Sequence, residues 1–435
     1  MLKDKNKLDI IELPEFSLDN PSKEYAKEIL SQDGVERVLL FPDSFTKSKY
    51  VGAEYKTTIP SSVVIQTDTE HLYPSFRSRG INCGMMLVSL PIEEKDLTED
   101  LINKIKKAFL YSLPYYTSFR LRLPFLKGKY DLSYKEFLKV LEGGAPSLKS
   151  KLNVLQEDIV KLEGGGVANN LNIDEAKKYF NSKWLNRRTV RMRHSFGRYF
   201  GGNHYLEIQI VEDVGSDKLG LKKGQVVVML HTGCQSLEDV VRPDLRENFI
   251  RQKSYKSVNK NSEMYKAFFM AQKALLNLIR AYRLTSFAML RDIFGSETKI
   301  VLERGHNYVS EEKGKLIYRH NAERLKDGGF AIVSGNFKHS SYVVEGGDGV
   351  EDHMHSIDHG IGSILKRAEK NEKKKGENVR ILRSKRGLYS ILKEGNEALI
   401  ENSVIKDYFA LMERKGIVKA NRAKLRPILN LKYTK

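Results

Sequence analysis

Four side chains that can bind a metal share one kind of local sequence. Cys83, His204, His231 and His306 each stand beside a stretch rich in β-forming residues, and each has Gly or Asn as a near neighbour. Binding residues are commonly placed where a rigid strand ends. One thiolate and three imidazoles can form a metal site, and a thiolate can bridge two ions. Ligand softness alone favours zinc, cobalt or iron over manganese.

Each of these residues also has a purely structural interpretation. A lone cysteine such as Cys83 is more often a small buried apolar residue than a ligand. A histidine after a glycine turn, such as His204, is more often part of an ordinary core. The four positions lie far apart in the sequence, so their spacing does not prove that they converge. Both interpretations stay open at this level.

A histidine cluster near the C-terminal end is the second chemically rich segment. His353, His355 and His359 lie among acidic residues. Only His359 is followed by a Gly-x-Gly sequence, which lets the backbone approach phosphates closely. It also precedes a predicted helix, whose N-terminal N–H groups favour an anion. His359 is therefore a candidate nucleophile, and the alternative is a polar loop or an additional metal clip.

The strands and helices that would position these residues follow from hydrophobic periodicity. The clearest predicted strand, residues 224–230, ends directly in His231. Further strands are predicted at 37–41, 62–66, 84–88, 205–211, 299–303, 330–333, 341–344 and 426–432, and helices at 98–113, 133–141, 148–162, 173–185 and 263–291. The chain shows no repeat and no clear domain boundary, which indicates a single domain over residues 1–435 with a helical insertion at about 98–185.

Four arginines precede the His204 segment. Arg187, Arg188, Arg191 and Arg193 alternate with smaller residues, and we interpret this segment as a strand. On a strand such a pattern gives one basic face that can contact phosphates. The alternative is a solvated edge strand that its charge protects from aggregation.

Composition limits the class of protein. The 435 residues are 40% hydrophobic, which suffices for a real core, and carry a formal net charge of +19, which favours an anionic partner such as nucleic acid. No apolar run of about 18 residues predicts a membrane span, and no signal peptide is recognisable. Only two cysteines are present, which points to a reducing, cytoplasmic setting. Phosphate-loop, dinucleotide, serine-elbow and zinc-finger spacings are absent.

The order of motifs resembles the RtcB family of RNA-splicing ligases over roughly residues 38–432. The matching pieces are Asn82-Cys83-Gly84-Met85, Gly202-Asn203-His204-Tyr205-Leu206-Glu207, Met229-Leu230-His231-Thr232-Gly233, His306-Asn307, Ser341-Tyr342-Val343-Val344-Glu345-Gly346, His359-Gly360-Ile361-Gly362 and Lys432. Each piece is weak alone, whereas seven pieces in the right order are strong evidence of homology.

The resemblance implies both a fold and an activity. The fold would be α+β, with a mixed, largely antiparallel β-sheet core surrounded by helices. The activity would be a ligase that uses GTP and Mn²⁺ to join RNA 3′-phosphate or 2′,3′-cyclic phosphate ends to 5′-hydroxyl ends, in tRNA splicing or RNA repair. The partners would be tRNA halves or other cleaved RNA and an archease-like activator. The protein would be a cytoplasmic monomer.

Residue roles follow from the same resemblance. Cys83 would bridge two metal ions, with His231 and His306 completing one site and His204 binding the other ion. His359 would attack the α-phosphate of GTP and carry GMP. The nucleotide would be held by Asn203, Glu207, Asn307, Ser341 and Lys432.

This sequence departs from the family pattern at several motif positions. Gly80 replaces the aspartate three residues before the metal cysteine, so the second metal site lacks a carboxylate and would be weakened. Phe45 stands where the family has a histidine, and Gln235 and Ser363 each stand where the family has an arginine. The leading hypothesis is therefore a divergent RNA ligase. The alternatives are a paralogue that guanylylates RNA ends without efficient sealing and one that only binds RNA.

Overall fold

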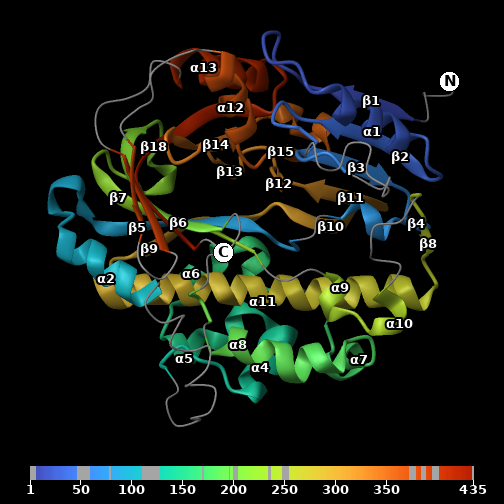
Figure 1. Ribbon diagram of the computed structural model, residues 1–435, viewed down its shortest axis with the longest axis horizontal. Coiled ribbons are helices and arrows are strands. Elements are labelled where there is room, and N and C mark those ends of the chain that lie inside the picture. The colour runs from blue at the N-terminus through green and yellow to red at the C-terminus, as the bar shows by residue number, and fades with distance from the viewer. Residues whose placement is uncertain are drawn as a thin grey trace.

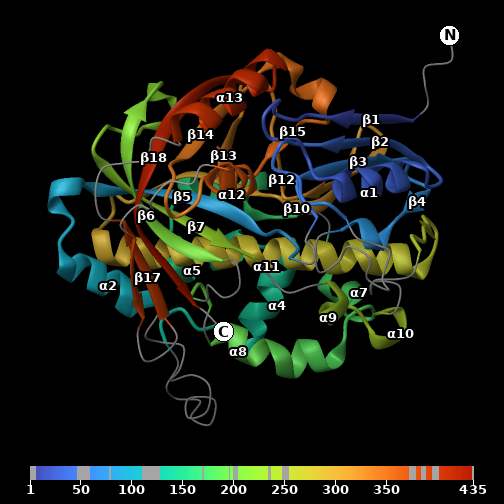
Figure 2. The same ribbon diagram turned by 45° about the horizontal axis from the view of Figure 1, so that its top comes forward.

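A computed structural model gives the architecture of the chain (Figures 1 and 2). It describes residues 6–46, 59–77, 80–109, 128–168, 171–194, 196–198, 204–233, 237–246, 254–371, 379–383, 388–393 and 401–433. Helices and predominantly antiparallel strands form the α+β fold that the sequence predicts. No helix among these residues is both long and apolar enough to cross a membrane.

The largest sheet carries the candidate ligands. Its strands follow one another in the order β13 (Phe330–Val333), β14 (Ser341–Gly346), β18 (Val418–Tyr433), β6 (Tyr205–Val214), β7 (Gln225–Thr232), β5 (Gly84–Glu93) and β9 (Lys299–Gly305), with β16 (Val379–Arg383) and β17 (Leu388–Lys393) attached to β18. Strands β5 and β7 are almost continuously apolar, because both faces of this part of the sheet are buried.

A second sheet lies beside the first. Its order is β1 (Lys7–Ile10), β2 (Val35–Leu40), β3 (Val63–Thr67), β11 (Lys315–His320) and β10 (Asn307–Glu312). Only the β1–β2 pair is parallel. Two short pairs complete the strands, β4 (His71–Leu72) with β8 (Val258–Asn259) and β12 (Ala322–Arg324) with β15 (Ser356–Asp358). The second pair leads the chain towards His359.

One long helix, α11 (Glu263–Phe294), runs along the length of the molecule beneath both sheets (Figure 1). The side chain of Ser262 caps its N-terminus by accepting the Tyr265 N–H, and Gly295 follows its last residue. Its middle is buried nearly all round, since the sheets cover one side and the helical insertion covers the other (Figures 1 and 2).

The remaining helices fall into two groups. The insertion below α11 contributes α2 (Glu99–Phe109), α4 (Tyr134–Gly143), α5 (Lys149–Leu152), α6 (Gln156–Val160), α7 (Ile173–Lys177) and α8 (Thr189–Arg193), followed by α9 (Leu237–Val240) and α10 (Pro243–Arg246). Helices α12 (Gly362–Asn371) and α13 (Glu401–Arg414) lie at the top of the molecule in Figure 1, and α1 (Asn20–Leu30) packs against strands β1 and β2 of the second sheet.

The arginine segment contradicts the strand prediction. Residues Trp184–Arg188 form a π-helical turn that continues into α8 (Thr189–Arg193). The alternation of large and small residues suggests the two-residue repeat of a strand. The apolar Trp184 and Leu185 just before the arginines instead pack into the helical insertion, as part of the same helical turn. Strand β16 (Val379–Arg383) is likewise not among the strands predicted from the sequence.

Candidate active site

Antiparallel alternation brings four predicted ligands to one edge of the large sheet. Strands β6, β7, β5 and β9 are consecutive neighbours, and each pair is antiparallel. His204 and Cys83 precede β6 and β5, whereas His231 ends β7 and His306 follows β9. Because neighbouring antiparallel strands run in opposite directions, the starts of β6 and β5 meet the ends of β7 and β9 at the same edge.

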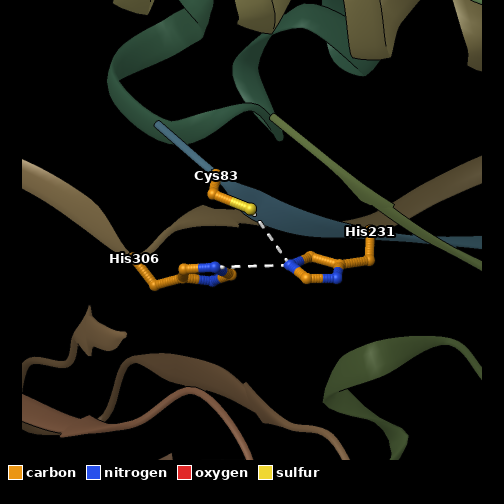
Figure 3. A group of neighbouring side chains, drawn as sticks. All are labelled: Cys83, His231 and His306. Atoms are coloured by element: carbon orange, nitrogen blue, oxygen red, sulfur yellow. Dashed lines mark hydrogen bonds between the residues drawn. The ribbon is translucent and has the colours of Figure 1, made fainter. Parts of the chain in front are cut away.

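Three of these side chains point at one another (Figure 3). The Sγ atom of Cys83 lies 3.1 Å from Nε2 of His231, and that nitrogen lies 3.4 Å from Nε2 of His306. All three ligand atoms are within 4.8 Å of one another, and all three residues are buried. No other set of three such residues comes this close among the residues that the structure describes.

Backbone hydrogen bonds hold the ligand segments together. The His306 N–H donates to the Cys83 carbonyl at 2.8 Å, and the Asn82 N–H donates to the Asn307 carbonyl at 2.7 Å. Asn82 has a φ of 49°, the left-handed region that asparagine tolerates better than most residues. The strand end at Cys83 is therefore locked to the strand end at His306 before any ion binds.

The donor set fits a divalent ion. Burial raises the pKa of the Cys83 thiol to about 12, with the positive charge of Arg283 acting in the opposite direction. Burial and the neighbouring His359 hold the pKa of His306 well below its usual value, so the imidazole is neutral and can offer a lone pair. His306 Nδ1 is buried without a hydrogen-bond partner. A bound cation would stabilise the thiolate and release its proton.

Ligand spacing agrees with that fit. Bonds of about 2.1 Å to a tetrahedral ion place ligand atoms about 3.4 Å apart. The 3.4 Å between the two histidine nitrogens matches this edge length, whereas the 3.1 Å from the Cys83 sulfur to His231 Nε2 is shorter. These three residues could together hold one divalent ion.

The opposite side of Cys83 is less complete. His204 Nε2 lies 3.4 Å from the Cys83 sulfur, so the thiol is shared between His204 and His231. A Cβ atom on Gly233 would lie 2.6 Å from that His204 nitrogen and 3.1 Å from the sulfur, so the space between the two ligands exists because residue 233 is glycine. Gly80 is near Cys83 but has no ligand atom, and its Cβ would lie 3.7 Å from that of Cys83.

His359 packs directly against this cluster. It follows β15, and its ring centroid lies 4.4 Å from that of His306 and 6.4 Å from that of His231. The Asn321 carbonyl lies 2.9 Å from His359 Nδ1. Because a carbonyl can only accept, Nδ1 must carry the proton and Nε2 must carry the lone pair. Burial lowers the His359 pKa to about 4, so the ring is neutral near neutral pH.

The other two histidines of the C-terminal cluster have different surroundings. His353 Nδ1 lies 2.7 Å from the Gly349 carbonyl, within its own short helix. His355 adopts a left-handed backbone conformation, with φ of 48°, and its carbonyl accepts the Leu325 N–H. Neither residue has a ring contact with the cysteine–histidine cluster among the contacts described, whereas His359 does.

Two buried acids lie behind His359. Asp43 Oδ1 accepts the backbone N–H groups of Ser363 and Ile364 at 2.7 and 2.9 Å and so caps the start of α12. The Tyr408 hydroxyl donates to Asp358 Oδ2 at 3.4 Å. Burial raises the pKa of both carboxyls. The negative charge of Asp43 raises the pKa of Asp358 further. Asp43 Oδ1 is thus occupied by the N-terminus of α12.

The predicted nucleotide ligands divide into two groups. Glu207 accepts from Asn430 Nδ2 and from Gln209 Nε2, both at 2.7 Å, and Gln209 also bonds Ser341 Oγ at 3.2 Å. Glu207 and Ser341 thus belong to one buried network, in which Gln209 and Asn430 were missed because neither stands in a recognisable motif. Burial raises the Glu207 pKa to about 7.

The second group is less directly placed. Asn307 Oδ1 accepts the Asn321 N–H at 2.7 Å, and Asn321 in turn holds His359. Lys432 pairs with Tyr389 in the β17–β18 ladder. Asn203 and Gln235 lie outside the described residues. The nucleotide-binding roles of Asn203, Asn307 and Lys432 stay predictions.

Comparisons with known proteins agree with this geometry. The family model for tRNA-splicing ligase RtcB matches residues 36–433. The chain therefore belongs to the RtcB family. It is 26% identical over 368 residues to the tRNA-splicing ligase RtcB of Pyrococcus furiosus, covering 73% of this chain and 36% of that protein. It is 25% identical over 354 residues to that of Thermococcus kodakarensis, covering 71% and 70%.

The coverage differs between relatives. The chain spans about two fifths or less of the three Pyrococcus proteins, at 36%, 38% and 40% of their lengths. The match to the protein of Nanoarchaeum equitans covers 69% of each chain at 26% identity. At this level of identity the membership is clear, while the roles of individual residues must be argued from the site itself.

Proposed function

We propose that this protein is an RNA ligase that uses GTP and Mn²⁺ to join RNA 3′-phosphate or 2′,3′-cyclic phosphate ends to 5′-hydroxyl ends. The single observation that carries the proposal is the placement of His359. Its Nδ1 is held by the Asn321 carbonyl, and its ring packs against His306 in the metal-ligand cluster. A neutral histidine fixed beside cation ligands is suited to attack a phosphate whose charge those cations offset.

The first step of the reaction takes place on His359. The Nε2 lone pair attacks the α-phosphorus of GTP, the N–P bond forms, and the bond from that phosphorus to the bridging oxygen of the β-phosphate breaks. Pyrophosphate leaves with the electron pair, and GMP stays on His359. The Asn321 carbonyl accepts from Nδ1–H throughout and stabilises the positive charge that develops on the ring. Water would first open a 2′,3′-cyclic phosphate to a 3′-phosphate. An oxygen of the 3′-phosphate then attacks the GMP phosphorus and breaks its bond to His359, and the 5′-hydroxyl attacks the activated 3′-phosphorus, forms the phosphodiester and releases GMP.

Two metal ions would bind, at sites with different numbers of protein ligands. Cys83, His231 and His306 would hold the first, and Cys83 with His204 would hold the second. The donor set alone suits softer ions than manganese, so we attribute the Mn²⁺ preference to phosphate oxygens that complete the coordination. A free thiol is essential to both sites, which suits the reducing, cytoplasmic setting that the small number of cysteines indicates.

The nucleotide would lie against the network of Glu207, Gln209 and Ser341. Asn203, Asn307 and Lys432 complete the proposed set. The RNA, either tRNA halves or another cleaved RNA, would be attracted by the net charge of +19. An archease-like activator and a monomeric state belong to the same proposal.

A second function is favoured by one observation, the absence of a carboxylate at Gly80. A weak second ion site would allow guanylylation of an RNA 3′-phosphate without efficient sealing.

One assay separates these functions. A labelled RNA with a 3′-phosphate is incubated with a 5′-hydroxyl RNA, GTP and Mn²⁺. A sealed product supports the ligase, and a guanylylated 3′ end without sealing supports the second function. A gel shift without either product would indicate a protein that only binds RNA. The His359→Ala variant is the control that must lose both products.

A further inference from the structure

A buried arginine lies directly beneath the metal-ligand cluster. Arg283, in the middle of α11, has a side chain that is 0% exposed. Its Nη1 donates to the Asn82 carbonyl at 3.0 Å and to the Thr232 carbonyl at 3.2 Å. Its Nη2 lies 2.5 Å from Oε1 of Glu303, which is also 0% exposed. One guanidinium therefore contacts three different strand ends.

The two carbonyls belong to residues adjacent to ligands. Asn82 precedes Cys83, and Thr232 follows His231. A Cβ atom on Gly84 would lie 2.8 Å from Arg283 Nη1, so the glycine after the cysteine gives the guanidinium room to reach these carbonyls. A planar group with several fixed donors can hold two carbonyls at a set separation, which a lysine ammonium at the end of a flexible chain cannot do as well.

The third ligand is tied to the same arginine through two acids. Glu303 Oε2 accepts the Glu163 N–H at 2.7 Å. Glu163 Oε2 accepts the Gly305 N–H at 3.1 Å, and Gly305 precedes His306. The chain from Arg283 through Glu303 and Glu163 thus reaches the third ligand-bearing strand end.

We propose that Arg283 is a positioning residue for the metal centre: it holds the backbones beside Cys83 and His231 at the separation a bound ion requires, with Glu303 fixing the guanidinium. The inference rests on the proposed metal centre and extends it to a residue that would touch neither the ion nor the nucleotide. Partners that orient metal ligands typically change metal affinity about 10–100-fold when they are removed.

The test uses Co²⁺ alone as the probe, in the full chain without nucleotide or RNA. The charge-transfer absorption of a cobalt–thiolate bond reports the Cys83 contact, and competition with a chelator gives the affinity. Arg283→Lys keeps the charge and loses the planar fork. We expect its Co²⁺ affinity to fall about 10–100-fold and its charge-transfer band to weaken or shift. A role limited to stability would lower the melting temperature and leave the band of the bound ion unchanged.

Two further variants keep the result interpretable. Arg291→Lys is the matched control, because Arg291 lies on the same helix and pairs with Asp158, away from the ligands. If Arg283→Lys does not fold, the double variant Arg283→Met with Glu303→Gln removes both buried charges together, and glutamine keeps an acceptor for the Glu163 N–H.

Each outcome decides the proposal. A folded variant with weakened Co²⁺ binding and an altered band, beside an unchanged Arg291→Lys, supports it. A folded variant with the affinity and band of the unaltered protein overturns it while leaving the metal centre in place. Absence of Co²⁺ binding by the unaltered protein would instead contradict the proposed function, and with it the premise of this inference.

Discussion

The two sides of the Cys83 thiol are built differently. On one side His231 and His306 are buried, and the His306 N–H donates a backbone hydrogen bond to Cys83. On the same side Arg283 donates to the carbonyls of Asn82 and Thr232, next to Cys83 and His231. On the other side the space between Cys83 and His204 is kept open by Gly233, and Gly80 offers no carboxylate. The first side is organised before an ion arrives. The second leaves much of its coordination to whatever ligand enters.

This difference indicates how the sequence can change on one side of Cys83 while the other side is kept. The first side shares its supports with the sheet core, since Arg283 and Glu303 are both wholly buried. Removing one partner of such a pair costs about 3–5 kcal/mol, so stability constrains these positions. Gly80 lies in a turn where a Cβ would have ordinary contacts, and the fold tolerates change there.

The largest expected effect comes from Cys83, because both sides depend on its sulfur. Cys83→Ala should lose essentially all bound metal, measured by elemental analysis after gel filtration, because both ion sites lose a ligand. Ser89→Ala on the same strand β5 serves as the control. Stoichiometric metal bound to the folded Cys83→Ala protein would contradict the assignment of Cys83, His231 and His306 as metal ligands.

A side chain at residue 233, between Cys83 and His204, should prevent binding of the second ion while the first is retained. A methyl group at Gly233 would lie 2.6 Å from His204 Nε2 and 3.1 Å from the Cys83 sulfur. Gly233→Ala should therefore retain one ion and lose the second, with Mn²⁺ stoichiometry by titration falling from two to one in the presence of GTP. Gly80→Ala adds a methyl group without this obstruction and is the matched control. Two ions in Gly233→Ala would show that the second ion binds elsewhere.

A carboxylate at residue 80 should strengthen metal binding on the His204 side of Cys83. Gly80→Asp is sterically acceptable, since its Cβ would lie 3.7 Å from that of Cys83. The Mn²⁺ concentration that gives half-maximal guanylylation should fall, by about tenfold if the new oxygen becomes a ligand. An unchanged or higher Mn²⁺ requirement, with Gly80→Ala measured in parallel, would mean that another group already completes the second site.

The smallest effect should be that of pH on the nucleophile. Because burial lowers the His359 pKa to about 4, its active neutral form predominates from pH 8 down to about 5 and is lost as the pH falls through 4. A nearby divalent cation would lower this pKa further. Single-turnover guanylylation at saturating Mn²⁺ should therefore be nearly level between pH 7.5 and 5.5, whereas a histidine of ordinary pKa would lose about tenfold over that range. A midpoint near 6.5 would contradict the buried, neutral His359.

The candidate ligands could be recognised in the sequence, whereas the residues that support them could not. His231 was identified because the strand before it is strongly apolar, and Cys83 because glycine and asparagine flank it. Their convergence could not be predicted from spacing, since it depends on the neighbour order β6, β7, β5 and β9. Neighbour order is set by long-range pairing, which local patterns do not encode.

The supporting residues were missed for a related reason. Arg283 lies in a helix whose periodicity predicts only core packing, and a buried arginine has no local signature that separates it from an exposed one. The arginine run before His204 shows the opposite error, because its alternation suggested a strand while Trp184 and Leu185 pack as part of a helix. In both cases tertiary contacts outweighed the local pattern.

The most direct test of the account is covalent guanylylation of His359. The protein is incubated with α-labelled GTP and Mn²⁺, and the labelled residue is mapped by mass spectrometry under conditions that preserve phosphoramidates. We predict an acid-labile GMP adduct on His359 that is absent in His359→Ala and retained in His353→Ala and His355→Ala. No adduct on a folded, metal-loaded protein, or an adduct on another residue, would contradict the assignment of His359 as the nucleophile.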